Sequence, residues 1–293
     1  MIILFTFVVQ AVSYEFQNKL GNFLGPKTFQ WGLILNGLLG PLLLGGAVAT
    51  FFEGSNFIIA KNNLVDAGAV TPIISRWANA SHGLDALMNP WVLVFGLAVM
   101  FLARVLGILY VMNNVNDEDI RSRGSVRLLG NAVPFVILFV AYLAHLLLKD
   151  GYAYNDEGVI FMEPYKYLNN LLDMWYLTII LLIGIALVLF GIGKTTWSKD
   201  YNSGIWPAGI GTVLTVLALL LCSAWNHTAY YPSTADLQSS LTMANSSSSE
   251  FTLRTMFYVS LLVPFVLAYI VYAWRAIDSK KLDKEEIKND HAY

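Results

Sequence analysis

The chain has 293 residues, of which 56% are hydrophobic and only 13% are charged, with 18 Lys and Arg against 20 Asp and Glu. Soluble proteins carry about 25% charged residues, so this composition excludes soluble enzyme folds, disordered chains and fibres. The net charge of −2 leaves no excess of positive charge to hold a polyphosphate backbone, which excludes nucleic acid as a partner.

Seven apolar runs follow one another along the chain, most of them near the roughly 20 residues that a helix needs to cross a bilayer. Each run predicts a helix, because lipid cannot satisfy open backbone groups. The predicted fold class is all-α, a polytopic transmembrane helical bundle. One transmembrane domain is expected over 1–277, with segments at 1–14, 28–52, 90–113, 128–148, 173–196, 206–228 and 255–277, followed by a charged tail over 278–293.

The first run is shorter than a full span and begins on Met1 with no basic residue before it. It continues into Tyr14 and Glu15 without a small-residue cleavage site, so it is not a typical signal peptide. The interpretation is that Met1 lies inside a transmembrane helix, so that the first segment is partial and the chain lacks an upstream part.

Positive charge differs between the two sets of alternate loops, and its excess marks the cytoplasmic side of a membrane protein. The set that includes 114–127 and the C-terminal tail holds twelve Lys and Arg, while the opposite set holds five. The C-terminus is therefore predicted to be cytoplasmic. The longer connections at 53–89, 149–172 and 229–254 are expected on the other side.

Ionisable residues inside spans are costly and are functional candidates by default. Three qualify, although each also has a structural interpretation. Arg104 lies in the middle of its run and is expected to face protein, an acidic partner or a water-filled cavity, with a structural ion pair favoured. His145 is a proton-relay or haem-ligand candidate, but a hydrogen-bonded histidine near a helix end is favoured. Glu53 is an interfacial carboxylate that is also a candidate entry point for protons.

Metal and haem sites have little support in the sequence. The chain has one cysteine, Cys222, and four histidines without the spacing of a ligand set, so no disulfide or thiolate cluster is expected within it. No catalytic, cofactor-binding or metal-binding residue is predicted in this chain. Asn36 and Asn131 are expected to bond across helix interfaces.

Several stretches resemble subunit II of the cytochrome bd-type quinol oxidases, particularly the versions from Bacteroidetes-like bacteria. A polar loop, its spacing to a Thr-Leu-x-x-Met helix start and a final Pro-containing helix are together the most specific match. The stretches that carry the resemblance are Val12–Lys19, Asn36–Thr50, Asn89–Gly107, Tyr231–Ser233, Ser240–Ser249, Thr252–Met256 and Pro264–Arg275.

The resemblance implies a nine-helix fold in which the seven segments correspond to helices 3–9. It implies an accessory, haem-free subunit in the bacterial inner membrane, paired as a heterodimer with subunit I, which holds the b-type and d-type haems and the quinol site. The complex would oxidise quinol and reduce O2 to water. This subunit would support assembly, contribute to proton supply and in some members hold a structural quinone or lipid.

Two other interpretations stay open. The first is a secondary transporter or channel whose pathway uses Glu53, Arg104 and His145, although no internal repeat supports it. The second is a truncated fragment without function of its own.

Overall fold

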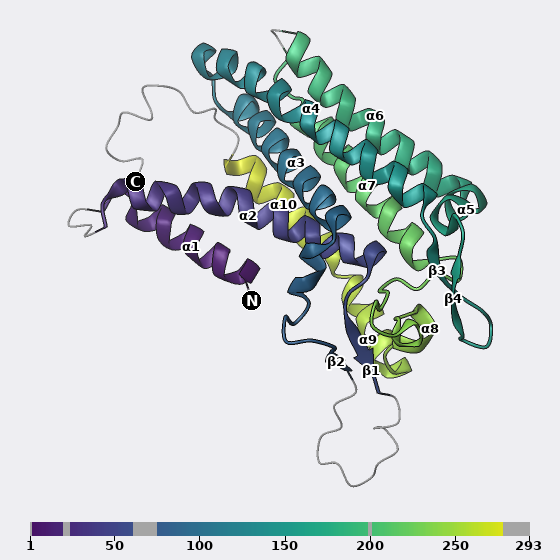
Figure 1. The fold of residues 1–293 in the computed structure, drawn as a ribbon. Helices are drawn as coiled ribbons and strands as arrows, with labels where there is room; N and C mark the ends of the chain where they lie inside the picture. The colour runs from purple at the N-terminus through teal and green to yellow at the C-terminus, as the bar shows by residue number, and fades with distance from the viewer. Residues whose placement is uncertain (1, 20–23, 61–74, 199–200, 278–293) are drawn as a thin grey trace.

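The computed structural model describes residues 2–19, 24–60, 75–198 and 201–277 (Figure 1). Most of these residues are helical, and the described part of the chain holds six helical stretches that are long and apolar enough to cross a membrane. The predicted all-helical, polytopic fold is therefore confirmed. The tail predicted over 278–293 lies outside the described residues.

The helices pack mainly against their neighbours in sequence: α1 on α2, α2 on α3, α3 on α4, and α6 on α7. Figure 1 shows α3, α4, α6 and α7 side by side, with the α1–α2 pair crossing beside them. In chain order the helices are α1 (Ile2–Phe16), α2 (Pro26–Glu53), α3 (Pro90–Asn114), α4 (Glu118–Leu148), α5 (Lys166–Asp173), α6 (Trp175–Trp197), α7 (Ile205–Ala224), α8 (Met243–Ser246), α9 (Glu250–Ser260) and α10 (Val263–Ile277).

Glycines allow two of these helix pairs to approach closely. A Cβ atom at Gly96 of α3 would lie 2.7 Å from the carbonyl oxygen of Leu42 in α2, and one at Gly184 of α6 would lie 2.8 Å from the carbonyl oxygen of Gly211 in α7. Small residues at such contacts let van der Waals packing hold helices together where lipid supplies no hydrophobic driving force.

A turn of three residues joins α3 to α4 and makes the two helices antiparallel. Asp117 caps α4, because its side chain accepts hydrogen bonds from the amides of Asp119 (2.8 Å) and Ile120 (3.2 Å). The turn places the last half of α3 against the first half of α4. It thereby brings Arg104 next to Asn131, 27 residues further along the chain.

A small layer outside the spans covers one end of the bundle (Figure 1). It contains two antiparallel hairpins, β1 (Phe57–Ile59) with β2 (Ser75–Trp77), and β3 (Gly151–Tyr154) with β4 (Ile160–Glu163). Helices α5 and α8 and two 3-10 turns, Leu84–Met88 and Leu237–Ser239, complete it. These elements lie in the long connections at 53–89, 149–172 and 229–254.

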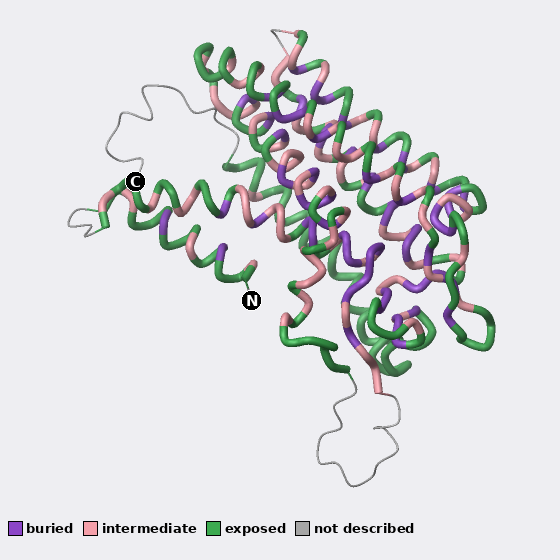
Figure 2. The backbone as a smooth tube through the Cα atoms, viewed as in Figure 1, coloured by how far each residue is buried: buried purple, intermediate pink, exposed green. Residues whose placement is uncertain are grey.

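The C-terminal span is divided into α9 and α10, where the sequence analysis expected one run over 255–277. The break falls at Leu261 and Leu262, just before Pro264. A proline ring lacks the amide hydrogen and clashes with the carbonyl four residues earlier, which interrupts the helix. No residue of α9 or α10 is buried, as the green tube in Figure 2 shows.

Candidate functional site

Glu53 is the last residue of α2, and only 6% of its side chain is exposed. Its Oε1 lies 3.1 Å from Nε2 of His145, and its Oε2 lies 2.9 Å from Nζ of Lys149. Gly54 ends α2 with a φ of 87°, a conformation that favours glycine. Two of the three predicted candidates, Glu53 and His145, are thus brought together by the ends of α2 and α4.

Lys149 also holds the backbone at the end of α2. Its ammonium donates a second hydrogen bond to the carbonyl oxygen of Phe52 at 2.9 Å. The last carbonyls of a helix have no partner within the helix and carry partial negative charge, so a cation is favoured there. Lys149 therefore neutralises Glu53 and caps α2 at the same time.

The ring of His145 is fixed from a third helix. Trp91, the second residue of α3, stacks on it with ring centroids 3.9 Å apart and planes within 4° of parallel. Tyr142 lies one turn earlier on α4, and its hydroxyl lies near Glu53 without making a hydrogen bond of ordinary geometry. We call Glu53, Trp91, Tyr142, His145 and Lys149 the Glu53 cluster.

Two further phenols approach the Glu53 cluster from the layer outside the spans. Burial and, next, the charge of Glu53 raise the pKa of Tyr152 in β3, and the same causes hold the pKa of Tyr167 in α5 well above its ordinary value. Both phenols therefore stay protonated at neutral pH. Within the described residues, the buried Tyr167 hydroxyl has no hydrogen-bond partner.

The Glu53 cluster ties the end of α2 to the end of α4 through the two ion pairs. The distance between Glu53 and His145 also allows a proton to pass between them. Both carboxylate oxygens already have basic partners, so a metal ion would have to break an existing pair. Among the residues that the structure describes, no group of three or more His, Cys, Asp or Glu is placed to hold a metal ion.

Arg104 lies apart from the Glu53 cluster, on the α3–α4 face and close to the middle of α3. Its Nε donates to Oδ1 of Asn131 at 2.7 Å, and Nδ2 of Asn131 donates to the carbonyl oxygen of Arg127 at 2.7 Å. The amide of Asn131 thus bonds across the helix interface, with Arg104 as its partner. In the described ranges, no carboxylate lies within ion-pair distance of Arg104.

Arg104 opens into a pocket of about 640 Å³ between α3 and α4. Three arginines contribute to its wall, together with two aspartates near the start of α4 and several apolar side chains. We call it the Arg104 pocket, and its wall consists of Arg104, Gly107, Ile108, Val111, Met112, Asp117, Asp119, Ile120, Arg123, Gly124, Arg127 and Asn131.

A second, apolar pocket of about 130 Å³ lies between α3, α4, α6 and α7. Its side chains are aliphatic or aromatic except for Thr212 and Thr215, whose hydroxyls donate to carbonyls of their own helix at 2.8 Å. The pocket therefore offers no polar group to orient a ligand and suits a hydrocarbon chain.

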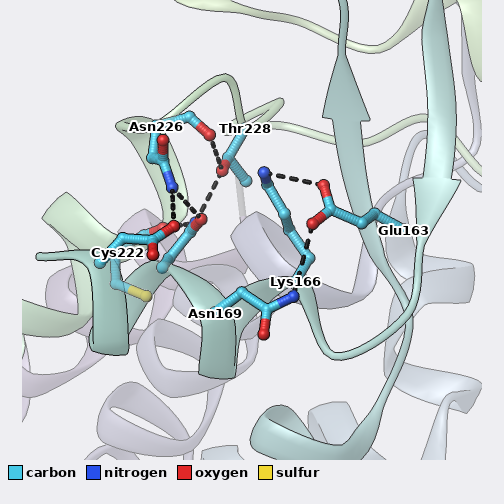
Figure 3. Close-up of polar contacts among 8 residues, drawn as sticks. Glu163, Lys166, Asn169, Cys222, Asn226 and Thr228 are labelled. Carbon is cyan, nitrogen blue, oxygen red and sulfur yellow. Dashed lines mark hydrogen bonds and ion pairs between the residues drawn. The ribbon is translucent and has the colours of Figure 1, made fainter.

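A polar network fixes α5 and the adjoining loops over the end of α7 (Figure 3). Lys166 is buried and pairs with Glu163 at 2.9 Å, and Asn170 donates to the carbonyl of Cys222 (2.9 Å) and to the hydroxyl of Thr228 (2.7 Å). Figure 3 shows the ammonium of Lys166 facing the carboxylate of Glu163, with Asn226 and Thr228 close together. The network holds the outer layer onto the bundle.

Sequence reasoning missed Lys149, Trp91 and the network around Lys166. Lys149 follows His145 by four residues, so the helix face that the two share was the available signal. Trp91 and Lys166 lie in interfacial stretches where aromatic and basic residues are common, and nothing in their spacing indicated a specific partner.

Comparison with known proteins gives one consistent result. The family model described as cytochrome bd terminal oxidase subunit II matches residues 1–277. The chain is similar to the cytochrome bd-I ubiquinol oxidase subunit 2 of Escherichia coli K12, with 22% identity over 100% of this chain and 76% of that protein. It is also similar to the cytochrome bd ubiquinol oxidase subunit 2 of Bacillus subtilis 168, with 22% identity over 97% of this chain and 73% of that protein.

Proposed function

Because this chain belongs to the cytochrome bd terminal oxidase subunit II family, we propose that it is the haem-free accessory subunit of a respiratory quinol oxidase. A subunit II works in a complex with subunit I, and that complex is a haem-containing oxidoreductase of the membrane. The proposal assigns the b-type and d-type haems and the quinol site to subunit I, so that quinol oxidation and O2 reduction to water take place there.

The position of His145 is the observation that carries this division of labour. His145 is the one histidine within the spanning helices that the structure describes, and haem iron is most often held by histidine. Its Nε2 faces Glu53, and its ring is stacked on Trp91. Binding haem iron through His145 would break the Glu53 cluster, which supports the assignment of the haems to subunit I.

The accessory role that the geometry supports best is assembly. The Glu53 cluster joins α2, α3 and α4 at one end of the bundle, which makes a rigid body for a partner to dock on. Among the described spans, the α9–α10 segment alone has no buried residue. We assign its exposed apolar surface to subunit I on one side and to lipid on the other.

The orientation follows from the loop charges, with the C-terminus in the cytoplasm and the membrane identified as the bacterial inner membrane. The Glu53 cluster then lies at the non-cytoplasmic end. Protons for O2 reduction come from the cytoplasm in this proposal, so Glu53 and His145 lie on the side opposite to proton uptake. A proton-supply role for them is the second candidate, and the buried phenol of Tyr142 beside Glu53 is what favours it.

The apolar pocket between α3, α4, α6 and α7 is the candidate position for a structural quinone or lipid in this subunit. Its wall of aliphatic and aromatic side chains suits the hydrocarbon tail of such a molecule. The polar ring or headgroup would lie outside this pocket, because the two threonine hydroxyls already bond to the backbone.

Co-expression with subunit I tests the proposal. We expect wild-type chain to yield a complex with b and d haem bands in reduced-minus-oxidised spectra, and quinol-dependent O2 uptake. Glu53→Gln should lower the amount of complex while each remaining complex keeps its turnover. Glu15→Gln is the matched control, because Glu15 also pairs with a lysine, Lys19 at 2.8 Å, but is largely exposed.

The two candidate roles give opposite results in this experiment. A Glu53→Gln complex with normal haem content and little O2 uptake would assign Glu53 to proton supply instead of assembly. Haem bands that remain with the purified chain in the absence of subunit I would contradict the haem-free role altogether.

A further inference from the structure

We propose that the Arg104 pocket binds the phosphodiester headgroup of an anionic phospholipid of the cytoplasmic leaflet. The inference rests on the membrane orientation given under the proposed function, and on no property of the oxidase reaction. It starts from a charge that the chain itself does not neutralise.

Arg104 lies ten residues before the end of α3, which is about 15 Å along the helix axis. A guanidinium at that depth is costly unless it is paired or reaches the headgroup region. Only its Nε is used within the described residues, on the neutral amide of Asn131, and the terminal nitrogens keep their hydrogens for another acceptor. The residue is exposed toward the pocket.

Two more arginines line the same pocket from α4. Arg123 and Arg127 are four residues apart, which places them on one face of the helix, and Asn131 continues that face. Both arginines are exposed, and neither has a carboxylate within ion-pair distance in the described part of the chain. Asp117 is engaged as the cap of α4. Asp119 also lies in the wall, so the pocket holds three arginines against two aspartates and keeps a net positive charge.

Arginine is suited to a phosphate, because its planar fork of donors matches two phosphate oxygens at once. The wall combines two kinds of side chain: Arg104 of α3 with Arg123 and Arg127 of α4 are charged, while Ile108, Val111 and Met112 of α3 are apolar. A ligand with a charged phosphodiester and hydrocarbon chains matches both parts. Basic pockets between spanning helices on the cytoplasmic side are typical sites for such headgroups.

Gly107 keeps this pocket open. It lies in its wall, and a Cβ atom there would meet no atom within 4 Å. A larger side chain at this position would therefore occupy the space of the ligand without removing a charge. Gly107→Leu is a sharp steric test, and the change also favours the helical backbone.

The test is lipid retention by the purified 293-residue chain in complex with subunit I. The complex is stripped with detergent, exposed to phosphatidylglycerol, phosphatidylcholine or inorganic phosphate, and the bound molecules are counted by native mass spectrometry. We expect one tightly retained phosphatidylglycerol, with phosphatidylcholine and inorganic phosphate unable to displace it. Arg127→Gln and Gly107→Leu should each weaken retention by about tenfold.

Lys27→Gln is the matched control, because Lys27 is an exposed cation at the predicted cytoplasmic end of α2 outside the pocket. Its retention should equal that of wild type. Equal retention in Gly107→Leu and wild type would overturn the proposal, and so would equal binding of phosphatidylcholine. Displacement by inorganic phosphate would replace it with a site for small anions. Haem content, read separately, reports on the proposed function alone.

Discussion

The Glu53 cluster and the Arg104 pocket place charge in the same bundle in two different ways. In the cluster, one carboxylate meets two basic side chains, and all three are mostly buried. In the pocket, three arginines are gathered with no carboxylate within ion-pair distance among the described residues, and they face outward. Helix α4 contributes to both. The difference indicates that the charges of the Glu53 cluster neutralise one another, whereas the arginines of the Arg104 pocket depend on solvent, lipid or a ligand.

The largest effect is expected from Glu53→Leu, which removes the carboxylate at the centre of the Glu53 cluster. It leaves Lys149 and His145 without their carboxylate in a largely buried position, and breaking a buried pair in this way costs about 3–5 kcal/mol. We expect little assembled complex, measured as haem per purified subunit. Wild-type levels of complex would show that the cluster adds nothing to stability.

Lys149→Met should have a smaller effect of the same kind. Glu53 keeps His145 as a partner, but the carbonyl of Phe52 loses its donor, and a lost hydrogen bond to a charged group costs about 1.5–3 kcal/mol. The midpoint of thermal unfolding of the complex should fall, with less loss of assembly than in Glu53→Leu. A double-mutant cycle with Glu53 measures their coupling, and strictly additive effects would contradict the ion pair.

Arg104→Leu tests the Arg104 pocket. It should lower the free energy of unfolding by only about 1 kcal/mol, because the hydrogen bond to the Asn131 amide is lost at an exposed position. Assembly should fall slightly while turnover per haem stays normal. A large loss of turnover with normal haem content would instead give Arg104 a direct part in the reaction.

Tyr167→Phe is expected to have the smallest effect on stability, and it tests how tightly the surroundings of the Glu53 cluster are packed. The Tyr167 hydroxyl is buried beside the Glu53 cluster and has no hydrogen-bond partner in the described structure, so removing it should raise stability by about 0–1 kcal/mol. Thermal unfolding of the complex measures this. A loss of stability would indicate that an ordered water molecule hydrogen-bonds to the hydroxyl beside the Glu53 cluster.

The spanning helices were predictable because each depends on a local run of apolar residues. The break before Pro264 was not predicted, and Pro41 and Pro134 lie inside unbroken helices. The pairing of Glu53 with His145 was not predictable, since 92 residues separate them and the fold alone brings the helix ends together. Arg104 was recognised as exceptional from its place in an apolar run. Its amide partner on another helix and its pocket depend on the α3–α4 turn. No sequence pattern predicts which side chains that turn brings into contact.

The exposed α9–α10 segment has a consequence for the life of the protein in the cell. A span without buried residues gains almost nothing from packing against its own chain, so only lipid and a partner hold it in place. Copies made in excess of that partner would expose a loosely held, proline-broken helix to the proteases of the membrane. We therefore expect turnover of unassembled chains, and not synthesis alone, to match the amounts of the two subunits.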